Sequence, residues 1–298
     1  MEKVSLGNTD LQISRVGFGT MSLDVLNDSS ETLLNHALEK GINYFDTADM
    51  YQQGANESLI GRAFRGKRKD LILATKTGNK WRANGSGWDW NPTKKNIISG
   101  IEESLQRLQT DHIDLYQLHG GTLEDPIDDI IEAFELLKAS GKIRYYGISS
   151  IRPAVIREYV KRSSIVSVMM QYSLLDRRPE EEMLAFLLKN KIAVMARGTI
   201  AKGLLVNKPA SEYLTHSAAD VAKAALSVKQ VAGSSRSPFD TAVQFVLQHP
   251  AVTSAIVGVR TDVQLADAIS PAIGRALTSV EYEELQKSIA ATTYLDHR

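Results

Sequence analysis

Short runs rich in β-branched and aromatic residues alternate with longer amphipathic segments along most of this chain, and that alternation limits the possible folds more than any other feature. In the longer segments apolar residues recur three and four positions apart, as at Ile97, Ile101, Leu105 and Leu108, which is typical of helices. The predicted strands are Val16–Thr20, Asn43–Asp46, Leu71–Thr75, Ile113–His119, Tyr145–Ser149, Val166–Gln171, Ile192–Ala196 and Thr253–Val257. Eight strands that alternate with helical segments predict a (β/α)8 TIM barrel, an α/β fold.

A doubly wound open sheet is the alternative fold for such a chain. It expects a Gly-x-Gly-x-x-Gly turn between its first strand and its first helix. The first predicted strand offers only Val16-Gly17-Phe18-Gly19-Thr20, which lacks the third glycine, and no helix begins there. We therefore expect the barrel, as a single domain over residues 1–298, since such barrels routinely reach about 250 residues.

Three segments depart from the simple repeat of strand and helix. Residues 3–15 resemble a hairpin before the first strand, with a turn at Gly7-Asn8. Residues 78–92 form a long loop after the third strand, and residues 203–237 form a second one after the seventh strand, helical around 218–231. Long loops at the carboxyl ends of barrel strands usually serve function.

Charge and composition exclude several classes of function. Acidic and basic residues balance at 35 each, so no overall field favours nucleic acid or membrane, and the basic run 65–69 is expected to be a solvated turn. The absence of cysteine excludes disulfides, thiolate catalysis and cysteine-bound metal. The first residues lack the apolar core of a signal peptide, and no apolar run approaches about 18 residues. We expect a cytoplasmic protein without a metal site.

Four reactive side chains fall at or just beyond the ends of the second, third and fourth predicted strands. Asp46 ends the second strand, and the phenol of Tyr51 follows five residues later. Lys76 follows the third strand, and His119 ends the fourth. Each alone has an ordinary explanation as a helix cap, a surface phenol, a paired lysine or a core histidine. Because the carboxyl ends of barrel strands meet at one mouth, their joint placement predicts a shared site.

These side chains together make a proton-donating site. Lys76 lies past an apolar strand and needs a carboxylate partner, for which Asp46 is the candidate. The charged amine then eases release of the Tyr51 proton to a substrate oxygen, and His119 donates a hydrogen bond to the same oxygen. Protonation of a carbonyl oxygen requires an electron source, so we expect a hydride-carrying cofactor.

In combination these motifs resemble the aldo-keto reductases. The resemblance rests on Gly41–Tyr51, on the strand that carries Lys76, on Asp114–His119 and on Gly147–Ser150, in that order along the chain. It implies a (β/α)8 barrel that binds NADPH in extended form, without a Rossmann domain. It also implies the four roles just given, a small-molecule carbonyl substrate and transfer of the pro-R hydrogen.

Further positions that match the family imply cofactor contacts. Two serines after the fifth strand and a glutamine after the sixth match contacts to the nicotinamide carboxamide, and an aromatic residue nearby commonly stacks on the ring. The segment 198–205 resembles the loop over the pyrophosphate, and 256–264 matches the adenosine-phosphate site. The implied cofactor residues are Ser149, Ser150, Gln171, Tyr172, Gly198, Lys202, Gly203, Leu204, Gly258, Arg260, Gln264 and Asp267.

The preference for NADPH over NADH depends mainly on Arg260, whose guanidinium can pair with a 2′-phosphate. Three positions depart from the family pattern. Ser150 stands where asparagine is usual, Thr199 where proline is common, and Ala268 where asparagine is expected to hold the adenine. None of these departures removes a catalytic group.

The substrate pocket and two other functions stay open at this point. Trp81, Trp88 and Trp90, all in the loop after the third strand, suggest an apolar substrate pocket, although they could instead pack that loop onto the barrel. Lys76 could form a Schiff base in an aldolase or lyase, but a salt bridge to Asp46 opposes this. An NADPH-binding regulatory protein with slow turnover is the other alternative. The sequence does not indicate an oligomeric state.

Overall fold

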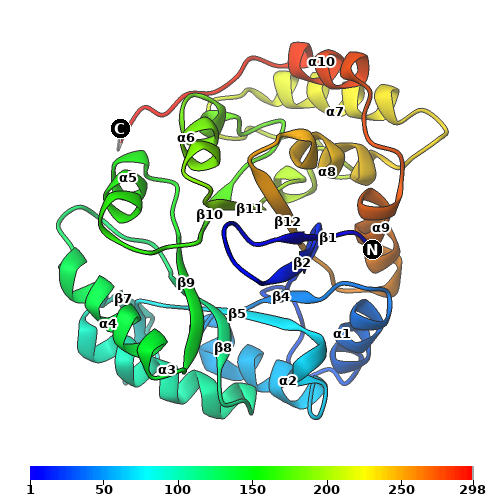
Figure 1. The fold of residues 1–298 in the computed structure, drawn as a ribbon. Coiled ribbons are helices and arrows are strands. Elements are labelled where there is room, and N and C mark those ends of the chain that lie inside the picture. Colours follow the sequence, from blue (N-terminus) through cyan, green and yellow to red (C-terminus); the bar gives the residue numbers. More distant parts are fainter. Residues whose placement is uncertain (297–298) are drawn as a thin grey trace.

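Eight parallel strands close into a barrel in the computed structural model, which describes residues 1–296 (Figure 1). Around the barrel each strand pairs with its neighbours along the chain, and β12 closes the ring by pairing with β3. The barrel strands are β3 (Val16–Gly19), β4 (Tyr44–Asp46), β5 (Ile72–Thr77), β8 (Ile113–Leu118), β9 (Ile143–Ser149), β10 (Ser167–Gln171), β11 (Ala193–Arg197) and β12 (Val252–Gly258). The predicted (β/α)8 fold is confirmed, and every predicted strand end lies within two residues of the observed one.

Helices surround the barrel (Figure 1), and most of them bury an apolar face against the outside of the strands, whereas two near the C-terminus pack on other helices. The helices are α1 (Ser29–Glu39), α2 (Ala55–Ala63), α3 (Lys94–Leu108), α4 (Ile127–Ala139), α5 (Pro153–Arg162), α6 (Met183–Lys189), α7 (Ala218–Ala232), α8 (Pro238–Gln248), α9 (Asp262–Ile273) and α10 (Ser279–Ser288). Several begin at a serine or threonine whose side chain accepts a backbone N–H, as Thr93 and Ser217 do. The predicted helix in 203–237 is α7, which lies beside α10.

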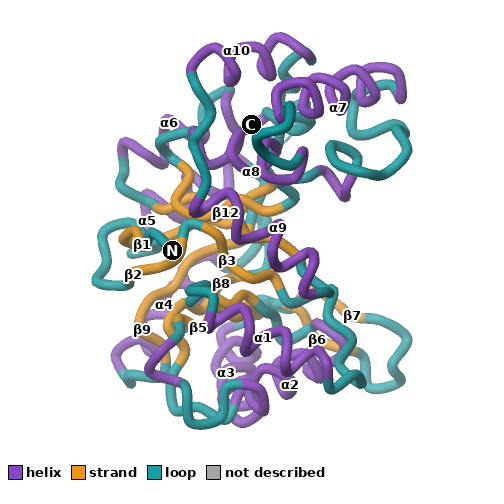
Figure 2. The backbone as a smooth tube through the Cα atoms, turned by 90° about the vertical axis from the view of Figure 1, so that its right-hand side faces the viewer, coloured by secondary structure: helices purple, strands orange, loops and turns teal. Residues whose placement is uncertain are grey.

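The two hairpins lie at opposite ends of the barrel (Figure 2). The first, β1 (Lys3–Ser5) with β2 (Gln12–Ser14), was predicted, and its Leu6, Leu11 and Ile13 are buried against the residues inside the barrel. The second, β6 (Asn79–Trp81) with β7 (Trp88–Trp90), lies within the long loop expected over 78–92, in which no strands were predicted. Two aromatic-rich runs pair there around the turn that contains Gly85, which has a φ of +70°.

Side chains that point into the barrel form successive layers, because alternate residues of a strand point to opposite faces. One apolar layer contains Tyr44, Ala74, Leu115, Met169 and Met195. Two residues further along the same five strands lie, in order, Asp46, Lys76, Gln117, Gln171 and Arg197. The fold therefore changes from an apolar interior to a polar layer at the carboxyl ends of the strands.

The basic run 65–69 is only partly the solvated turn that was expected. Arg68 Nη2 donates to Asp114 Oδ2 at 2.6 Å and to the His112 carbonyl at 3.1 Å. Asp114 is 1% exposed at the start of β8, so its buried carboxylate requires this partner. Within the described part of the chain, no helix is long and apolar enough to cross a membrane.

Candidate active site

Asp46 and Lys76 form a buried ion pair at the carboxyl ends of β4 and β5. Lys76 Nζ donates to Asp46 Oδ2 at 2.5 Å and to the Thr47 carbonyl at 2.7 Å, and Lys76 is 1% exposed. Burial alone would lower the pKa of Lys76, but the charge of Asp46 and then the Tyr51 phenol outweigh burial, so the pKa is raised. The amine is therefore held in its charged form.

Two neighbours that the sequence did not single out hold this pair in place. Gln117 Nε2 donates to Asp46 Oδ1 at 3.3 Å. Asn56 Oδ1 accepts from Thr47 Oγ1 at 2.8 Å and so fixes the residue whose carbonyl binds the lysine. Gln117 and Asn56 are both fully buried. They contact the ion pair or its backbone and position it.

Tyr51 and His119 complete the cluster that the sequence predicted. The Lys76 Nζ lies 5.2 Å from the centre of the Tyr51 ring. The rings of Tyr51 and His119 have their centres 5.9 Å apart and meet edge to face, at 78°. The structure thus brings together Asp46, Tyr51, Lys76 and His119, although they are up to 73 positions apart in the sequence.

His119 is a neutral ring in this site. Burial lowers its pKa to about 3, helped by the charges of Lys76 and then Arg197. Its Nδ1 is buried without a hydrogen-bond partner among the described residues. A neutral imidazole has one N–H to donate and one nitrogen to accept, so it can bind a substrate oxygen without losing a proton.

The backbone just after Tyr51 adopts an unusual conformation. Gln52, Gln53 and Gly54 have φ values of +44°, +53° and +85°, a left-handed region that non-glycine residues seldom adopt. Gln52 Nε2 donates to the carbonyls of Met21 and Leu23, which fastens this turn to the loop after β3. Strained backbone of this kind concentrates at functional sites, and here it sets the position of the phenol.

A second buried ion pair lies beneath this turn. Glu57 Oε2 accepts from Arg107 Nε at 2.7 Å, and Glu57 Oε1 accepts from Thr75 Oγ1 at 2.6 Å. Asp49 lies close by, and its backbone N–H donates to the Lys76 carbonyl at 3.2 Å. Burial, and then the Glu57 charge, raise the pKa of Asp49 to about 7.

The residues predicted to hold the nicotinamide carboxamide lie at the ends of β9 and β10. Ser149 and Ser150 are largely buried, while Gln171 is partly exposed and donates through Nε2 to Tyr213 Oη at 2.7 Å. Arg197 Nη1 donates to Gln171 Oε1 at 3.3 Å, on the neighbouring strand. Arg197 thus belongs to this group, and sequence reasoning missed it. The signal was the period of two in β11, which places Arg197 on the same face as Ala193 and Met195.

Tyr172 does not fit the expectation of a cofactor contact. Its ring is 0% exposed, and its hydroxyl donates to Glu180 Oε1 at 2.8 Å. It points into the packing around Phe245, because it is one residue out of phase with the inward-facing Gln171. Because Tyr172 has no free ring face, we no longer include it among the residues proposed to bind the cofactor.

The predicted pyrophosphate loop is a tight turn after β11. Gly198, Ala201, Lys202 and Gly203 have φ values of +70°, +47°, +58° and +95°. The Lys202 side chain is exposed, whereas Gly203 and Leu204 are buried within the turn. This loop therefore offers backbone and one lysine, and not Leu204, to a ligand.

The predicted adenosine-side residues cluster where β12 leads into α9. Gly258 pairs with Gly19 of β3, so this edge of the mouth carries no side chains. Gln264 Oε1 accepts from the backbone N–H of Arg260 at 2.9 Å. The Arg260 guanidinium is exposed and, within residues 1–296, has no ion-pair partner. Asp267 follows in α9 and is partly exposed.

Two of the three tryptophans fasten the β6–β7 hairpin to the barrel. Trp81 Nε1 donates to the Met50 carbonyl at 3.2 Å, and Trp90 Nε1 donates to Asp125 Oδ1 at 2.9 Å. Trp88 is 46% exposed and is paired with Trp81 across the hairpin. Trp88 is therefore the member of the set with most ring area free for a substrate.

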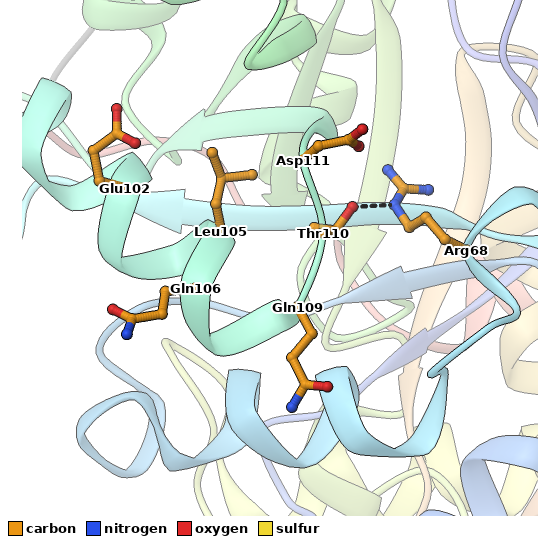
Figure 3. A pocket seen from close by; sticks show the side chains of 7 residues that line it. All are labelled: Arg68, Glu102, Leu105, Gln106, Gln109, Thr110 and Asp111. Atoms are coloured by element: carbon orange, nitrogen blue, oxygen red, sulfur yellow. Dashed lines mark hydrogen bonds between the residues drawn. The ribbon is translucent and has the colours of Figure 1, made fainter.

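An open hollow elsewhere on the surface does not coincide with this cluster. It is lined by Arg68, Glu102, Leu105, Gln106, Gln109, Thr110 and Asp111 (Figure 3). These residues lie at the C-terminal end of α3 and before β5 and β8, which is the opposite end of the barrel from Lys76.

The fold and the cluster define a (β/α)8-barrel protein with a proton-donating site at the carboxyl ends of its strands. Comparison with known proteins identifies the family to which this barrel protein belongs. Residues 15–290 match the model of the aldo/keto reductase family, and the chain belongs to that family of oxidoreductases.

The chain is 50% identical over 307 residues to the uncharacterized oxidoreductase YqkF of Bacillus subtilis, and the match covers 100% of both. The NADH-specific methylglyoxal reductase of Escherichia coli is 30% identical over 72% of each chain. Among solved structures, the holo form of aldo-keto reductase AKR11C1 from Bacillus halodurans matches with a TM-score of 0.95 and 45% identity, over 100% of this chain and 99% of that one. Its apo form, with the same coverage, matches with a TM-score of 0.85 and 42% identity. The arrangement of this chain is thus more similar to the holo form.

Proposed function

We propose that this protein reduces aldehydes or ketones to alcohols with NADPH, and that Tyr51 is the general acid. The observation that carries the proposal is the contact of the Tyr51 ring with both the charged Lys76 and the neutral His119. A phenol between an ammonium group and a neutral imidazole can give up a proton, because the ammonium group stabilises the phenolate that remains.

The described residues fit a nicotinamide dinucleotide. Gln117 Oε1 and His119 Nδ1 are buried and have no hydrogen-bond partner among the described residues, so the mouth of the barrel has hydrogen-bonding groups free for a ligand. Lys202 and Arg260 have no ion-pair partner within residues 1–296, so both cations are free to bind the phosphate groups of the cofactor. Ser149, Ser150 and Gln171 would hold the nicotinamide end, and the Gly198–Gly203 loop would cover the pyrophosphate.

Each member of the cluster has a separate role in the reaction. NADPH, when bound, supplies the hydride for the carbonyl carbon. Tyr51 donates its proton to the carbonyl oxygen, and the neutral His119 orients that oxygen with an N–H. Lys76 stays charged through Asp46 and stabilises the phenolate until a proton from solvent restores the phenol.

The same geometry argues against a Schiff-base aldolase. An amine must lose its proton to attack a carbonyl carbon, and the raised pKa of Lys76 opposes that loss. Lys76 Nζ is also buried and donates to both Asp46 and Thr47. A nucleophilic lysine would need a free lone pair and access to the substrate.

The test is steady-state oxidation of NADPH by the purified protein with 4-nitrobenzaldehyde, followed through the loss of the reduced nicotinamide absorbance. We expect turnover that depends on both reactants and yields the benzyl alcohol. Tight NADPH binding without turnover on a panel of aldehydes and ketones would contradict the proposal and favour the regulatory alternative.

The choice of cofactor is tested at Arg260. If its guanidinium pairs with a 2′-phosphate, Arg260→Gln should weaken NADPH binding by about tenfold or more and leave NADH binding unchanged. Isothermal titration of both cofactors measures this. An equal loss for NADPH and NADH would contradict the assignment, and preferred binding of NADH by the wild type would contradict the NADPH preference itself.

A further inference from the structure

Arg197 is the one cation of the polar layer whose charge is not neutralised nearby. Lys76 is paired with Asp46 at 2.5 Å, and His119 is neutral. Within the described residues 1–296 the Arg197 side chain forms no ion pair, and its one hydrogen bond runs from Nη1 to the neutral Gln171 at 3.3 Å. Arginine stays protonated at any working pH, so the layer carries an excess positive charge.

The position of Arg197 is fixed by the barrel. It ends β11 on the inward-facing side, two residues beyond Met195 and four beyond Ala193, both of which pack inside the barrel. In the parallel ladder it is the direct partner of Gln171. Its guanidinium therefore lies beside the amide that we assign to the nicotinamide carboxamide.

The charge of Arg197 also reaches the reacting groups. Burial, Lys76 and Arg197, in that order, lower the pKa of His119. Burial raises the pKa of Asp46, and the charges of Lys76 and Arg197 oppose that rise. A group bound between Gln171 and His119 would lie in the same positive field.

From this placement, and resting on the proposed function, we infer that Arg197 makes the site discriminate between the two redox states of the cofactor, in favour of the reduced one. The nicotinamide ring is neutral in NADPH and carries a positive charge in NADP⁺. A neighbouring guanidinium repels only the charged ring. Arg197 is exposed in the structure, and a ring bound against it would displace that water and so strengthen the repulsion. The protein should therefore bind NADPH more tightly than NADP⁺ and favour reduction of the carbonyl compound.

The test uses equilibrium binding and needs no substrate. Dissociation constants for NADPH and NADP⁺ are measured by titration for the wild type, Arg197→Gln and Arg197→Lys. We expect the wild-type ratio of Kd for NADP⁺ to Kd for NADPH to be well above one. Arg197→Gln should lower that ratio by about tenfold, and Arg197→Lys should retain most of it. A tenfold change corresponds to about 30 mV in the midpoint potential of the bound couple.

Arg162→Gln is the matched control. Arg162 ends α5, outside the barrel, and pairs with Asp128 of α4, so its loss removes the same charge from the protein without touching the polar layer. Its ratio should equal that of the wild type. Thermal unfolding of each variant shows whether it is folded. If the glutamine variant is not, Arg197→Met, a second neutral replacement that should lower the ratio equally, is measured in its place.

The other outcomes overturn either the inference or the proposed function. An unchanged ratio in Arg197→Gln would overturn the inference and leave the proposed function standing. An equal loss of affinity for both redox forms would also overturn it, and would assign Arg197 to a phosphate that both forms share. A wild type that binds neither form would overturn the proposed function itself.

Discussion

At the scale of single residues, the chemistry of this site depends on a charge that the protein interior would not otherwise tolerate. Lys76 is 1% exposed and Asp46 is 4% exposed, so each ion is stable only because the other is present. Removal of one partner leaves an uncompensated buried charge, which is far more costly than removal of both.

Lys76→Met should therefore destabilise the protein by roughly 3–5 kcal/mol at neutral pH. The double variant Lys76→Met with Asp46→Asn should recover most of that loss, because neither charge remains. Urea unfolding at one temperature measures both free energies. If the Lys76→Met loss persists undiminished beside Asp46→Asn, the pair is not the source of the cost.

The buried carboxyl group of Asp49 predicts how the stability of the fold depends on pH. Its folded-state pKa is about 7, above the ordinary 3.8, so the folded protein prefers the protonated acid and loses stability as pH rises from 3.8 through 7. Asp49→Asn mimics the protonated form. It should stabilise the protein by up to about 4 kcal/mol above pH 7 and make little difference near pH 4.

Unfolding measured across this pH range checks the Asp49 prediction. The control is Asp89→Asn, which removes an exposed carboxylate whose pKa is lowered by its hydrogen bond to Arg82. That change should not stabilise the protein at high pH. A stability difference for Asp49→Asn that is constant with pH would show that the carboxyl is not held protonated in the fold.

How far the sequence predicts the site differs from residue to residue. Asp46, Tyr51, Lys76 and His119 were predicted to share a site, because each lies at or just beyond a strand end that a barrel brings to one mouth. Tyr172 was misplaced, because its distance from a strand end says nothing about the partner, Glu180, that holds it in the packing. The neutral state of His119 could not be predicted, since it depends on burial and on charges from other strands.

At the scale of elements, the turn from β4 into α2 connects the stability of the fold to the orientation of Tyr51. Gly54 has a φ of +85°, and a Cβ there would lie 2.7 Å from Cδ of Arg107. Arg107 is the partner of the buried Glu57. The turn can thus adopt this conformation, with Arg107 in place, only if residue 54 has no side chain.

Gly54→Ala should cost clearly more stability than the roughly 1 kcal/mol expected from the left-handed backbone alone. It should also lower kcat, because the turn sets the position of Tyr51. Gly66→Ala is the matched control, since Gly66 has a φ of +77° but a Cβ added there would meet nothing within 4 Å. Equal losses of stability in the two variants would show that Arg107 moves aside freely.

Element prediction succeeded where one physical signal dominates. Apolar runs of four to seven residues gave the eight barrel strands, and the Gly7 turn, with a φ of +56°, gave the first hairpin. The β6–β7 hairpin was read as a loop, since Trp88-Asp89-Trp90 is too short to stand out as a strand. Its pairing depends on contacts with Met50 and Asp125, which lie in other loops.

At the scale of the whole molecule, the barrel separates stability from chemistry. One end is closed by the β1–β2 hairpin (Figure 2), whose apolar side chains are buried there, and the other end carries the polar layer. The alternation of strands and helices predicted the barrel, and the turn at Gly7 predicted the hairpin that closes one end.

The central claim is that Tyr51 donates the proton, and the most direct test is the single-turnover rate of NADPH oxidation with 4-nitrobenzaldehyde in Tyr51→Phe. Tyr145→Phe is the control, since its phenol bonds Asp10 at the other end of the barrel. We predict a rate roughly 100- to 10,000-fold below wild type for Tyr51→Phe, with unchanged NADPH affinity, and a wild-type rate for Tyr145→Phe. A Tyr51→Phe rate equal to that of the wild type would contradict the account.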